Sequence, residues 1–273
     1  SLTAAHADLH IDIAVDRDAR TLSITDNGIG MSRDEVIENI GTIARSGTRK
    51  FLESLSGDAR RDTRLIGQFG VGFYSAFIVA DRVTLTTRKA GAPEGEGVRW
   101  ASSGSGEYTL ETVDAPLRGT TVTLHLKDDE GEFLDNWKLR ELIKRYSDHV
   151  AFPIRLPVQE DGKPTAAFET VNHAAALWTR PKGELKDEDY QAFYKSLSHD
   201  FSDALAWTHN RVEGSQNYTL LLFVPEKPPF DAVFSGRDER HGLKLYIRRV
   251  FIMDASEQLL PNYMRFVRGV VDS

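Results

Sequence analysis

The sequence predicts an α+β two-layer sandwich with a mostly antiparallel sheet, followed by a second, α/β domain. Residues 11–25 alternate between apolar and polar side chains on both sides of a polar turn, which is typical of a β-hairpin. Residues 83–126 contain short β-rich segments separated by turns with Gly or Pro, and helical patterns flank them. The length of 273 residues is sufficient for two domains with separate cores.

A short helix is predicted directly after the hairpin. Ser32 is followed three residues later by Glu35, which is the spacing of a capping box. We expect this helix to end near Asn39. Residues 41–66 contain several Gly and Ser residues and only short apolar groups, so we expect a mobile lid there.

The remaining elements of the first domain follow from their apolar patterns. The apolar run at 73–80 predicts a helix that is buried on most sides. A helix is also expected over 134–146, packed on the sheet and ended by Pro153. Between them an antiparallel meander is expected, with strands at 83–88, 98–101, 108–113 and 120–126.

A polar stretch with Gly and Pro at 159–167 is the predicted linker. It divides the chain into a first domain at 1–158 and a second at 168–273. The second domain is expected to contain a helix at 187–198 and a strand at 218–224. A β-rich run at 243–253 and the start of an amphipathic segment at 263–267 should follow.

Composition excludes several classes of partner. The net charge of −7 argues against a nucleic-acid partner, and no apolar run approaches the roughly 20 residues that a membrane span needs. The chain has no cysteine, so it can form neither a disulfide nor a thiolate metal site, which fits the cytoplasm. The His and Asp residues between His199 and His209 lack the spacing of a metal motif, so no metal site is predicted.

Asp26 ends a predicted strand and begins an Asp-x-Gly-x-Gly motif with Gly28 and Gly30. A carboxylate at a strand end can accept a hydrogen bond from the exocyclic amine of adenine, and the glycines allow the flat base to approach the backbone. The same residues also suit an ordinary strand–turn–helix junction. The motif alone leaves both interpretations open.

A second glycine motif, Gly-x-x-Gly-x-Gly at 67–72, directly precedes a predicted helix. Its backbone N–H groups and the positive end of the helix dipole could hold phosphate. The spacing is the reverse of the dinucleotide-binding fingerprint, and no Gly-x-x-x-x-Gly-Lys-Ser/Thr sequence occurs. The two glycine motifs together, with a capped helix and the expected lid between them, indicate a nucleotide pocket.

The amino-acid sequences of these motifs resemble the nucleotide site of the heat-shock-protein-90 chaperones of bacterial type. The matching segments are Asp-Asn-Gly-Ile-Gly-Met at 26–31, the segments at 40–48 and 118–120, and Gly-Gln-Phe-Gly-Val-Gly-Phe at 67–73. Residues 176–180, 246–253 and 260–269 look like the start of that family's middle domain. The resemblance covers nearly the whole chain and implies a Bergerat-type (GHKL) ATP-binding domain followed by part of an α/β middle domain.

The resemblance also implies roles for individual residues. Asp26 would bind the adenine amine directly, Thr120 would support it through an ordered water, and Gly30 and Met31 would line the base. Asn39 and Arg45 match positions near the ribose and phosphates, and Arg45 replaces the lysine of many relatives, which keeps the charge but changes the hydrogen-bond geometry. The loop around the phosphates would comprise Gly67, Gln68, Phe69, Gly70, Val71, Gly72 and Phe73.

For the intact protein the resemblance implies ATP or ADP with Mg²⁺ as cofactor, and ATP hydrolysis coupled to protein folding. Lid closure would promote contact within a homodimer whose cycle remodels client proteins. The family's water-activating glutamate and Mg²⁺-binding asparagine precede the hairpin at 11–25, and its γ-phosphate arginine follows a segment like 269–273. We therefore expect a fragment that binds nucleotide with negligible hydrolysis of its own, and we assign no catalytic residue.

Two other function classes are alternatives. One is a different GHKL-type ATPase, such as a histidine kinase or a DNA-repair or topoisomerase ATPase, although no phospho-acceptor histidine helix or basic second domain is seen. The other is an interaction module in which the glycines only form turns. That module would not bind nucleotide, so a titration with ATP or ADP distinguishes it.

Overall fold

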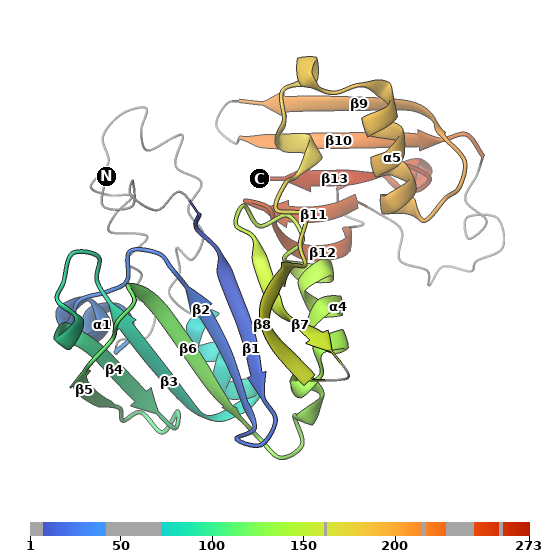
Figure 1. Cartoon of the computed structure of the whole chain (residues 1–273). Helices are drawn as coiled ribbons and strands as arrows, with labels where there is room; N and C mark the ends of the chain where they lie inside the picture. Colours follow the sequence, from blue (N-terminus) through green and yellow to red (C-terminus); the bar gives the residue numbers. More distant parts are fainter. Residues whose placement is uncertain (1–7, 42–71, 161–162, 214–216, 228–242, 257–258) are drawn as a thin grey trace. The chain divides into compact units, whose positions relative to one another are not determined.

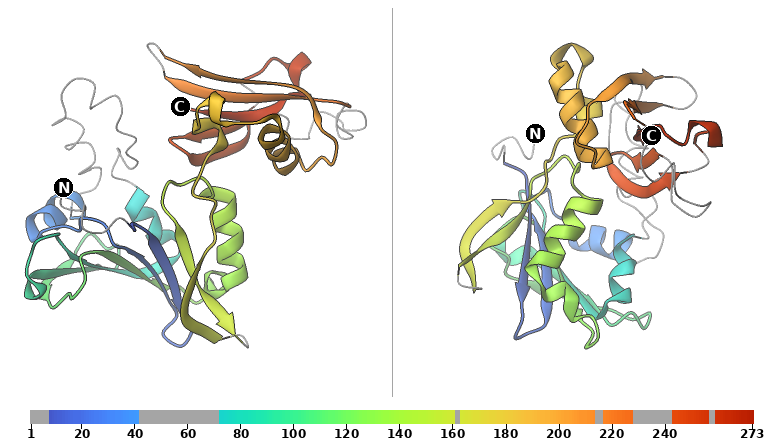
Figure 2. Two further views of the ribbon diagram at one scale, coloured as in Figure 1. Left: turned by 45° about the horizontal axis from the view of Figure 1, so that its top comes forward. Right: turned by 90° about the vertical axis from the view of Figure 1, so that its right-hand side faces the viewer.

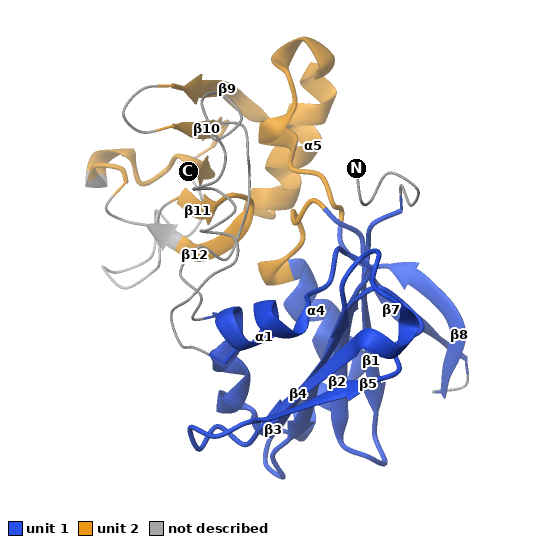
Figure 3. Cartoon of the chain, turned by 90° about the vertical axis from the view of Figure 1, so that its left-hand side faces the viewer, with its two compact units in different colours: residues 1–144, 152–172 blue, residues 145–151, 173–273 orange. Residues whose placement is uncertain are grey.

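The computed structural model describes residues 8–41, 72–160, 163–213, 217–227, 243–256 and 259–273. The chain divides into two compact units (Figure 3). Unit 1 comprises residues 1–144 and 152–172, and unit 2 comprises residues 145–151 and 173–273. Within the described residues, no helix is both long enough and apolar enough to cross a membrane.

Unit 1 is built on an eight-stranded sheet with the order β5-β4-β3-β6-β2-β1-β7-β8 (Figure 1). Its neighbouring strands run antiparallel except for β1 and β7, which are parallel. This confirms the prediction of a mostly antiparallel sheet. The strands are β1 (Ile11–Asp16), β2 (Thr21–Asp26), β3 (Ala80–Arg88), β4 (Gly97–Ser102), β5 (Thr109–Val113), β6 (Gly119–Leu126), β7 (Ile154–Glu160) and β8 (Lys163–Thr170).

The two faces of this sheet differ in polarity because side chains alternate along each strand. One face, called here the inner face, carries buried Leu22, Val83, Leu85, Trp100 and Leu124. Helices α1 (Arg33–Asn39) and α4 (Asn136–Tyr146) and the 3₁₀ helix η1 (Gly72–Ile78) lie on one side of the sheet, as the right-hand view of Figure 2 shows. Short 3₁₀ turns η2 (Glu94–Glu96) and η3 (Gly131–Leu134) complete the unit. The two-layer prediction is thus confirmed.

The opposite, outer face is polar. Its hydroxyls pair across neighbouring strands, with 3.0 Å between Ser23 Oγ and Thr123 Oγ1 and 3.1 Å between Thr25 Oγ1 and Thr121 Oγ1. Cross-strand hydroxyl pairs of this kind contribute to sheet stability in place of apolar packing.

The predicted hairpin and first helix are confirmed. β1 and β2 pair from Ile11↔Asp26 to Asp16↔Thr21. Ser32 caps α1: its hydroxyl accepts from Glu35 N at 3.4 Å, and Glu35 Oε2 accepts from Ser32 N at 2.7 Å. Both halves of the capping box are therefore present.

Two expectations differ from the structure of unit 1, and a third falls outside the described residues. Strands β3, β4 and β5 form a meander, but β6 pairs with β3 and β2 because the loop after β5 carries the chain back across the end of the sheet. The helix expected at 73–80 to be buried on most sides is the 3₁₀ helix η1, which has no buried residue; Ile78 is 70% exposed, since η1 packs against only one face of the sheet. The lid expected at 41–66 lies outside the described residues, except for Gly41.

The linker expected at 159–167 is wrong. Gln159 and Glu160 end β7 and residues from Lys163 onward form β8, which pairs with β7 as the last hairpin of unit 1. The polar Gly-Lys-Pro sequence that indicated a linker accompanies a hairpin on the edge of a sheet, where Pro and charged residues are tolerated. The chain leaves unit 1 after Asn172 instead.

Unit 2 has a five-stranded sheet with the order β12-β11-β13-β10-β9. The expected helix at 187–198 and strand at 218–224 are confirmed, and the β-rich run at 243–253 is a hairpin that turns at Arg248 and Arg249, both with positive φ. The amphipathic segment expected to start at 263–267 comprises the end of a 3₁₀ turn and the residues that lead into the last strand of the sheet. The elements are β9 (Ala204–Val212), β10 (Tyr218–Pro225), β11 (Leu243–Ile247), β12 (Val250–Ser256), β13 (Arg268–Asp272), α5 (Asp187–Ser198), η4 (Leu177–Thr179), η5 (Lys182–Glu184) and η6 (Asn262–Met264).

The core of unit 2 is aromatic. Trp178, Tyr194 and Phe223 are at most 1% exposed and pack with Leu221 and Val270. The indole Nε1 of Trp178 donates to the carboxylate of Asp272 at 2.8 Å, which satisfies the only polar atom of this buried ring.

Candidate nucleotide-binding site

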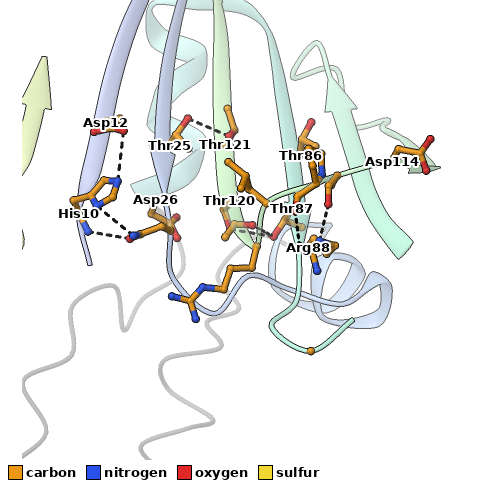
Figure 4. Close-up of a pocket in the computed structure, with 17 residues that line it drawn as sticks. His10, Asp12, Thr25, Asp26, Thr86, Thr87, Arg88, Asp114, Thr120 and Thr121 are labelled. Carbon is orange, nitrogen blue, oxygen red and sulfur yellow. Dashed lines mark hydrogen bonds and ion pairs between the residues drawn. The ribbon is translucent and has the colours of Figure 1, made fainter. Parts of the chain in front are cut away.

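Three polar residues form a row on the inner face, where β2 and β3 end and β6 begins. Asp26 is the register partner of Thr120, and Thr120 is the partner of Thr87, so their side chains share one face. Figure 4 shows the three beside one another on neighbouring strands. The structure therefore brings together Asp26 and Thr120, which lie far apart in the sequence.

Thr87 connects this row and was not identified from the sequence. Its side chain is 1% exposed, and its hydroxyl donates to Gly119 O at 2.8 Å while it accepts from Met31 N at 3.0 Å. It also lies 3.1 Å from Thr120 Oγ1. Because one buried hydroxyl joins the turn after β2 to the start of β6, Thr87 positions both Met31 and Thr120. A Thr in a β-rich run gave no signal of this role.

Glycine is required at two positions around Asp26. Gly30 has φ +62°, and a Cβ there would lie 1.9 Å from Arg88 O. Gly119 has φ +111°, and its Cβ would lie 2.1 Å from Asp26 O. Both are backbone contacts, and backbone cannot move aside as a flexible side chain can. The turn and β6 thus approach closely enough to enclose Asp26 on its strand.

The Asp26 carboxylate is a half-buried acceptor. Its Oδ1 accepts from Gly28 N at 2.8 Å, which fixes its rotamer. Burial raises the pKa of Asp26, although the backbone hydrogen bonds from Gly28 and Thr120 act in the opposite direction. A carboxylate with partial desolvation gains more from a ligand donor than a fully hydrated one does, because less water is displaced.

Asn27, the next residue, holds the entry to β1. Its side-chain oxygen accepts from His10 N at 2.9 Å, and its Nδ2 donates to Asp8 O at 2.8 Å. On β1, Asp12 accepts a bidentate pair from Arg155 on β7 at 2.6 and 2.8 Å. The turn after β2 is therefore tied to the segment that leads into β1. The sequence places Asn27 in the Asp-x-Gly-x-Gly motif but gives no sign of this contact.

Helix α1 is fixed to β3 beside the row. Lys89 Nζ donates to Glu35 Oε1 at 2.6 Å, and Met31 N is held by Thr87 as described above. At the other end of α1, the side-chain oxygen of Asn39 is buried and has no hydrogen-bond partner in the part of the chain that the structure describes. An unsatisfied buried acceptor of this kind fits a donor from a ligand.

The glycine motif at 67–73 is described only at its end. Gly72 is the first residue of η1, and the ring of Phe73 packs edge-on against Trp100 with 5.4 Å between centroids. The hydroxyl of Tyr74 donates to Ile40 O, which ties η1 to the end of α1. The predicted residues Arg45, Gly67, Gln68, Phe69, Gly70 and Val71 lie outside the described residues. The described residues contain no group of three or more His, Cys, Asp or Glu side chains that could hold a metal ion.

Two family models match separate parts of the chain. Residues 1–131 match the model described as histidine kinase-, DNA gyrase B-, and HSP90-like ATPase, and residues 159–273 match the Hsp90 protein model. The first match covers every described element of the site.

Curated proteins match nearly the whole length of this chain. Chaperone protein HtpG of Nitrosococcus oceani is 60% identical over 97% of this chain, and that of Hydrogenovibrio crunogenus is 58% identical over 100%. Chaperone protein HtpG of Yersinia pestis is 56% identical over 97%. The matches cover 42%, 44% and 42% of these relatives, so the chain spans less than half of their length.

Proposed function

Since this chain belongs to the Hsp90 family, we propose that it forms the nucleotide-binding part of an ATP-dependent molecular chaperone. The relatives that it resembles are named as chaperones, and its first 131 residues match an ATPase family. The Hsp90 match at 159–273 favours this function over a histidine kinase or a DNA-repair or topoisomerase ATPase. ATP hydrolysis and its coupling to protein folding are proposed for the whole protein.

The observation that carries this proposal is the half-buried Asp26 carboxylate held in the row with Thr120 and Thr87. An ionised carboxylate only accepts hydrogen bonds. The exocyclic amine of adenine is a donor at this position, whereas guanine presents a carbonyl oxygen. Asp26 would therefore bind adenine and repel guanine, which makes ATP and ADP the expected nucleotides.

The neighbouring residues would complete the base and ribose site. Thr120 would hold an ordered water against the base, with its hydroxyl oriented by Thr87. Gly30 and Met31 would line the base, since the Gly30 turn leaves no side chain between base and backbone. The buried oxygen of Asn39 would accept from a ribose hydroxyl. Arg45 and the 67–73 loop would contact the phosphates, following the family resemblance.

Mg²⁺ would accompany the nucleotide. A nucleotide-bound Mg²⁺ takes most of its ligands from phosphate oxygens and water, with few from protein. The absence of an acidic cluster among the described residues is compatible with that arrangement. Bound Mg²⁺ would neutralise phosphate charge, and the residues of this chain would orient the base and ribose.

In the whole protein we further propose that lid closure over 41–66 promotes contact within a homodimer and that the cycle remodels client proteins in the cytoplasm. Nucleic acid and membranes are not proposed as partners, in keeping with the net charge of −7. Both the dimer and the clients would depend on parts of the relatives that this chain does not match.

The test is a calorimetric titration of ADP and GDP, with and without Mg²⁺, into the chain and its Asp26→Asn variant. The amide nitrogen that this substitution introduces cannot accept, and the amide oxygen carries no full charge, so ADP affinity should fall about tenfold or more. Asp18→Asn in the exposed hairpin turn is the matched control and should bind as the unchanged chain does. Equal binding of ADP by the Asp26→Asn variant, or equal binding of ADP and GDP, would remove Asp26 from its role.

A further inference from the structure

Asn27 and Gly28 form the only Asn-Gly pair in the sequence, and they lie in the turn directly after β2. Asparagine is a chemically labile residue, and a following glycine favours its deamidation because no side chain hinders attack by the glycine nitrogen. The six other asparagines are each followed by a larger residue. Spontaneous chemical change of an asparagine is therefore expected first at this turn.

The reaction needs only water as a co-reactant. The backbone nitrogen of Gly28 loses its proton and attacks the side-chain carbon Cγ of Asn27, and the amide nitrogen leaves as ammonia. The resulting succinimide ring then takes up water at one of its two carbonyl carbons. Cleavage of the new Cγ–N bond gives aspartate, whereas cleavage of the original backbone C–N bond gives isoaspartate, which carries one more carbon in the backbone.

Both reacting groups are held by hydrogen bonds in the folded chain. Gly28 N donates to Asp26 Oδ1 at 2.8 Å, so the nitrogen that must lose its proton is engaged. Asn27 Oδ1 accepts from His10 N at 2.9 Å, and Asn27 Nδ2 donates to Asp8 O at 2.8 Å. Attack on Cγ therefore requires release of the Asn27 side chain and of the Gly28 nitrogen.

The contacts that fix the Asn27 side chain come from a segment without secondary structure of its own. Residues 8–10 form no helix or strand, and β1 begins only at Ile11. Asp8 is exposed and His10 is half-buried. Segments of this kind open locally at a lower free-energy cost than the whole domain. The Asn27 side chain is therefore released without unfolding of the sheet.

Either product removes these contacts permanently. An aspartate at position 27 has no donor for Asp8 O and places a second carboxylate next to Asp26. Isoaspartate lengthens the backbone before Gly28 and so displaces the turn between β2 and α1. The change is irreversible because the amide nitrogen has left as ammonia.

From this arrangement we propose that Asn27 is a deamidation site of the folded chain, and that the hydrogen bonds of the turn after β2 set the rate at which it reacts. The modification requires neither nucleotide nor a second protein. Its products loosen the segment that leads into β1 and the turn that carries Asp26.

The test compares the folded chain with the same chain in guanidinium chloride at the same mildly alkaline pH. Trypsin releases residues 21–33 as one peptide with a single asparagine, so mass spectrometry follows the conversion of amide to acid, and chromatography separates aspartate from isoaspartate. Conversion is expected in both samples, at least about tenfold slower in the folded chain. Asn210, which is followed by arginine, is the internal control and should convert more slowly than Asn27 in the unfolded chain.

Hydrogen exchange makes the comparison quantitative. Base-catalysed exchange of the Gly28 amide and attack on Asn27 pass through the same deprotonated nitrogen. Folding should therefore slow deamidation by at least the factor by which it slows exchange of this amide. A smaller slowing would mean that the reaction does not need the opening of the turn, and would contradict the proposal.

Two variants test the contact on the nitrogen. Asp26→Ala removes the acceptor of the Gly28 N–H, so deamidation of the folded chain should become about threefold faster or more. Asp16→Ala is the matched control, because Asp16 Oδ1 accepts from Ala19 N at 2.9 Å in the same way at the other end of the hairpin. Its rate at Asn27 should stay within about twofold of the unchanged chain.

Three further outcomes would overturn the proposal. The first is conversion at Asn27 in the unfolded chain with none in the folded chain, which would restrict the reaction to the unfolded state. The second is an equal rate in both, which would show that the contacts of Asn27 and Gly28 do not control it. The third is an equal acceleration in Asp26→Ala and Asp16→Ala, which would show a general loosening of the hairpin. The comparison of folded and unfolded chain stands even if Asp26→Ala does not fold.

Discussion

The carbonyl oxygen of Arg88 lies where a side chain on Gly30 would begin: a Cβ on Gly30 would be 1.9 Å from it. The turn after β2 therefore touches the backbone of β3 directly. This contact aligns Met31 N with the Thr87 hydroxyl and sets the floor on which we propose that adenine lies.

Gly30→Ala should consequently destabilise unit 1 and abolish ADP binding. The methyl group must displace the backbone of β3, and such a conflict, together with the positive φ, costs about 2–4 kcal/mol. Gly91→Ala is the control, because Gly91 also has positive φ, at +86°, but open space around its Cβ. Chemical denaturation of both variants separates the steric effect from the φ effect, and equal destabilisation would contradict the proposed role of the contact.

Thr87→Val should lower both the stability of the fold around the site and the affinity for ADP. Valine keeps the shape but leaves Gly119 O and Met31 N without the hydroxyl that pairs with them, which costs about 1–3 kcal/mol. ADP affinity should fall as well, because Thr120 loses its partner. Thr86→Val, the neighbouring change on the outer face, should leave ADP affinity unaltered. A calorimetric titration of both variants checks this, and unchanged affinity in Thr87→Val would show that Thr87 only stabilises the fold.

Asp26→Asn should stabilise the nucleotide-free protein at neutral pH even though it weakens nucleotide binding. The folded-state pKa of Asp26 is raised by burial, so the folded state binds more protons than the unfolded state between the two pKa values. The unmodified protein therefore loses stability as pH rises through this window, and the loss is complete above the folded pKa. Thermal unfolding from pH 4 to 8 should show this trend in the unmodified chain and a smaller one in the variant. If Asp26→Asn were less stable than the unmodified chain at pH 7, the ionised Asp26 carboxylate would not be destabilising the fold, which contradicts the prediction.

Asn27→Ala should release the segment before β1. The substitution removes the acceptor of His10 N and the donor to Asp8 O, so the amide of His10 should exchange with solvent at least about tenfold faster. Hydrogen exchange measured by NMR provides the test. Asn210→Ala in unit 2, where the amide bonds to Thr208 on the same strand, should leave His10 unaffected. An unchanged exchange rate in Asn27→Ala would mean that other contacts hold this segment.

Unit 2 should lose stability in mild acid through His149. Its ring packs on Trp178 and Tyr246, with 4.6 and 5.6 Å between ring centroids, and burial lowers its pKa, while Asp148 favours the charged form and His173 and Lys244 oppose it. The unfolded state therefore binds more protons below the ordinary pKa of about 6.5, and stability falls as pH decreases from there. His149→Gln should remove this dependence, whereas His199→Asn at an exposed site should not. Hydrogen exchange of the Val270 amide, measured between pH 5 and 7.5, reports the stability of unit 2. If the stability of His149→Gln depends on pH as that of the unchanged chain does, His149 is not the group that causes the dependence.

Local signals predicted the local elements well. The hairpin of β1 and β2 follows from alternation, and α1 follows from the Ser32 and Glu35 capping box, because both depend on neighbours within a few residues. The position of β6 between β3 and β2 and the hairpin of β7 and β8 depend on pairing between distant segments. A polar Gly-Pro stretch is compatible with both a linker and an edge hairpin, so the sequence alone did not distinguish them.

The site was predictable to the same extent. Asp26, Gly30 and Thr120 belong to recognisable motifs, and the structure brings them together. Thr87 and the side chain of Asn27 were not identified, because their roles arise from where β3 and the segment before β1 lie in space.

The parallel pairing of β1 with β7 has a consequence for synthesis on the ribosome. Ile11 pairs with Ile154, and Asp12 with Arg155, so β1 acquires this neighbour only after the residues up to β7 have been made. Until then one edge of β1 has unpaired backbone groups that can pair with another chain. A shortened chain that ends at residue 131, where one family match ends, would keep this edge permanently open. Recombinant versions of unit 1 should therefore extend through Asn172.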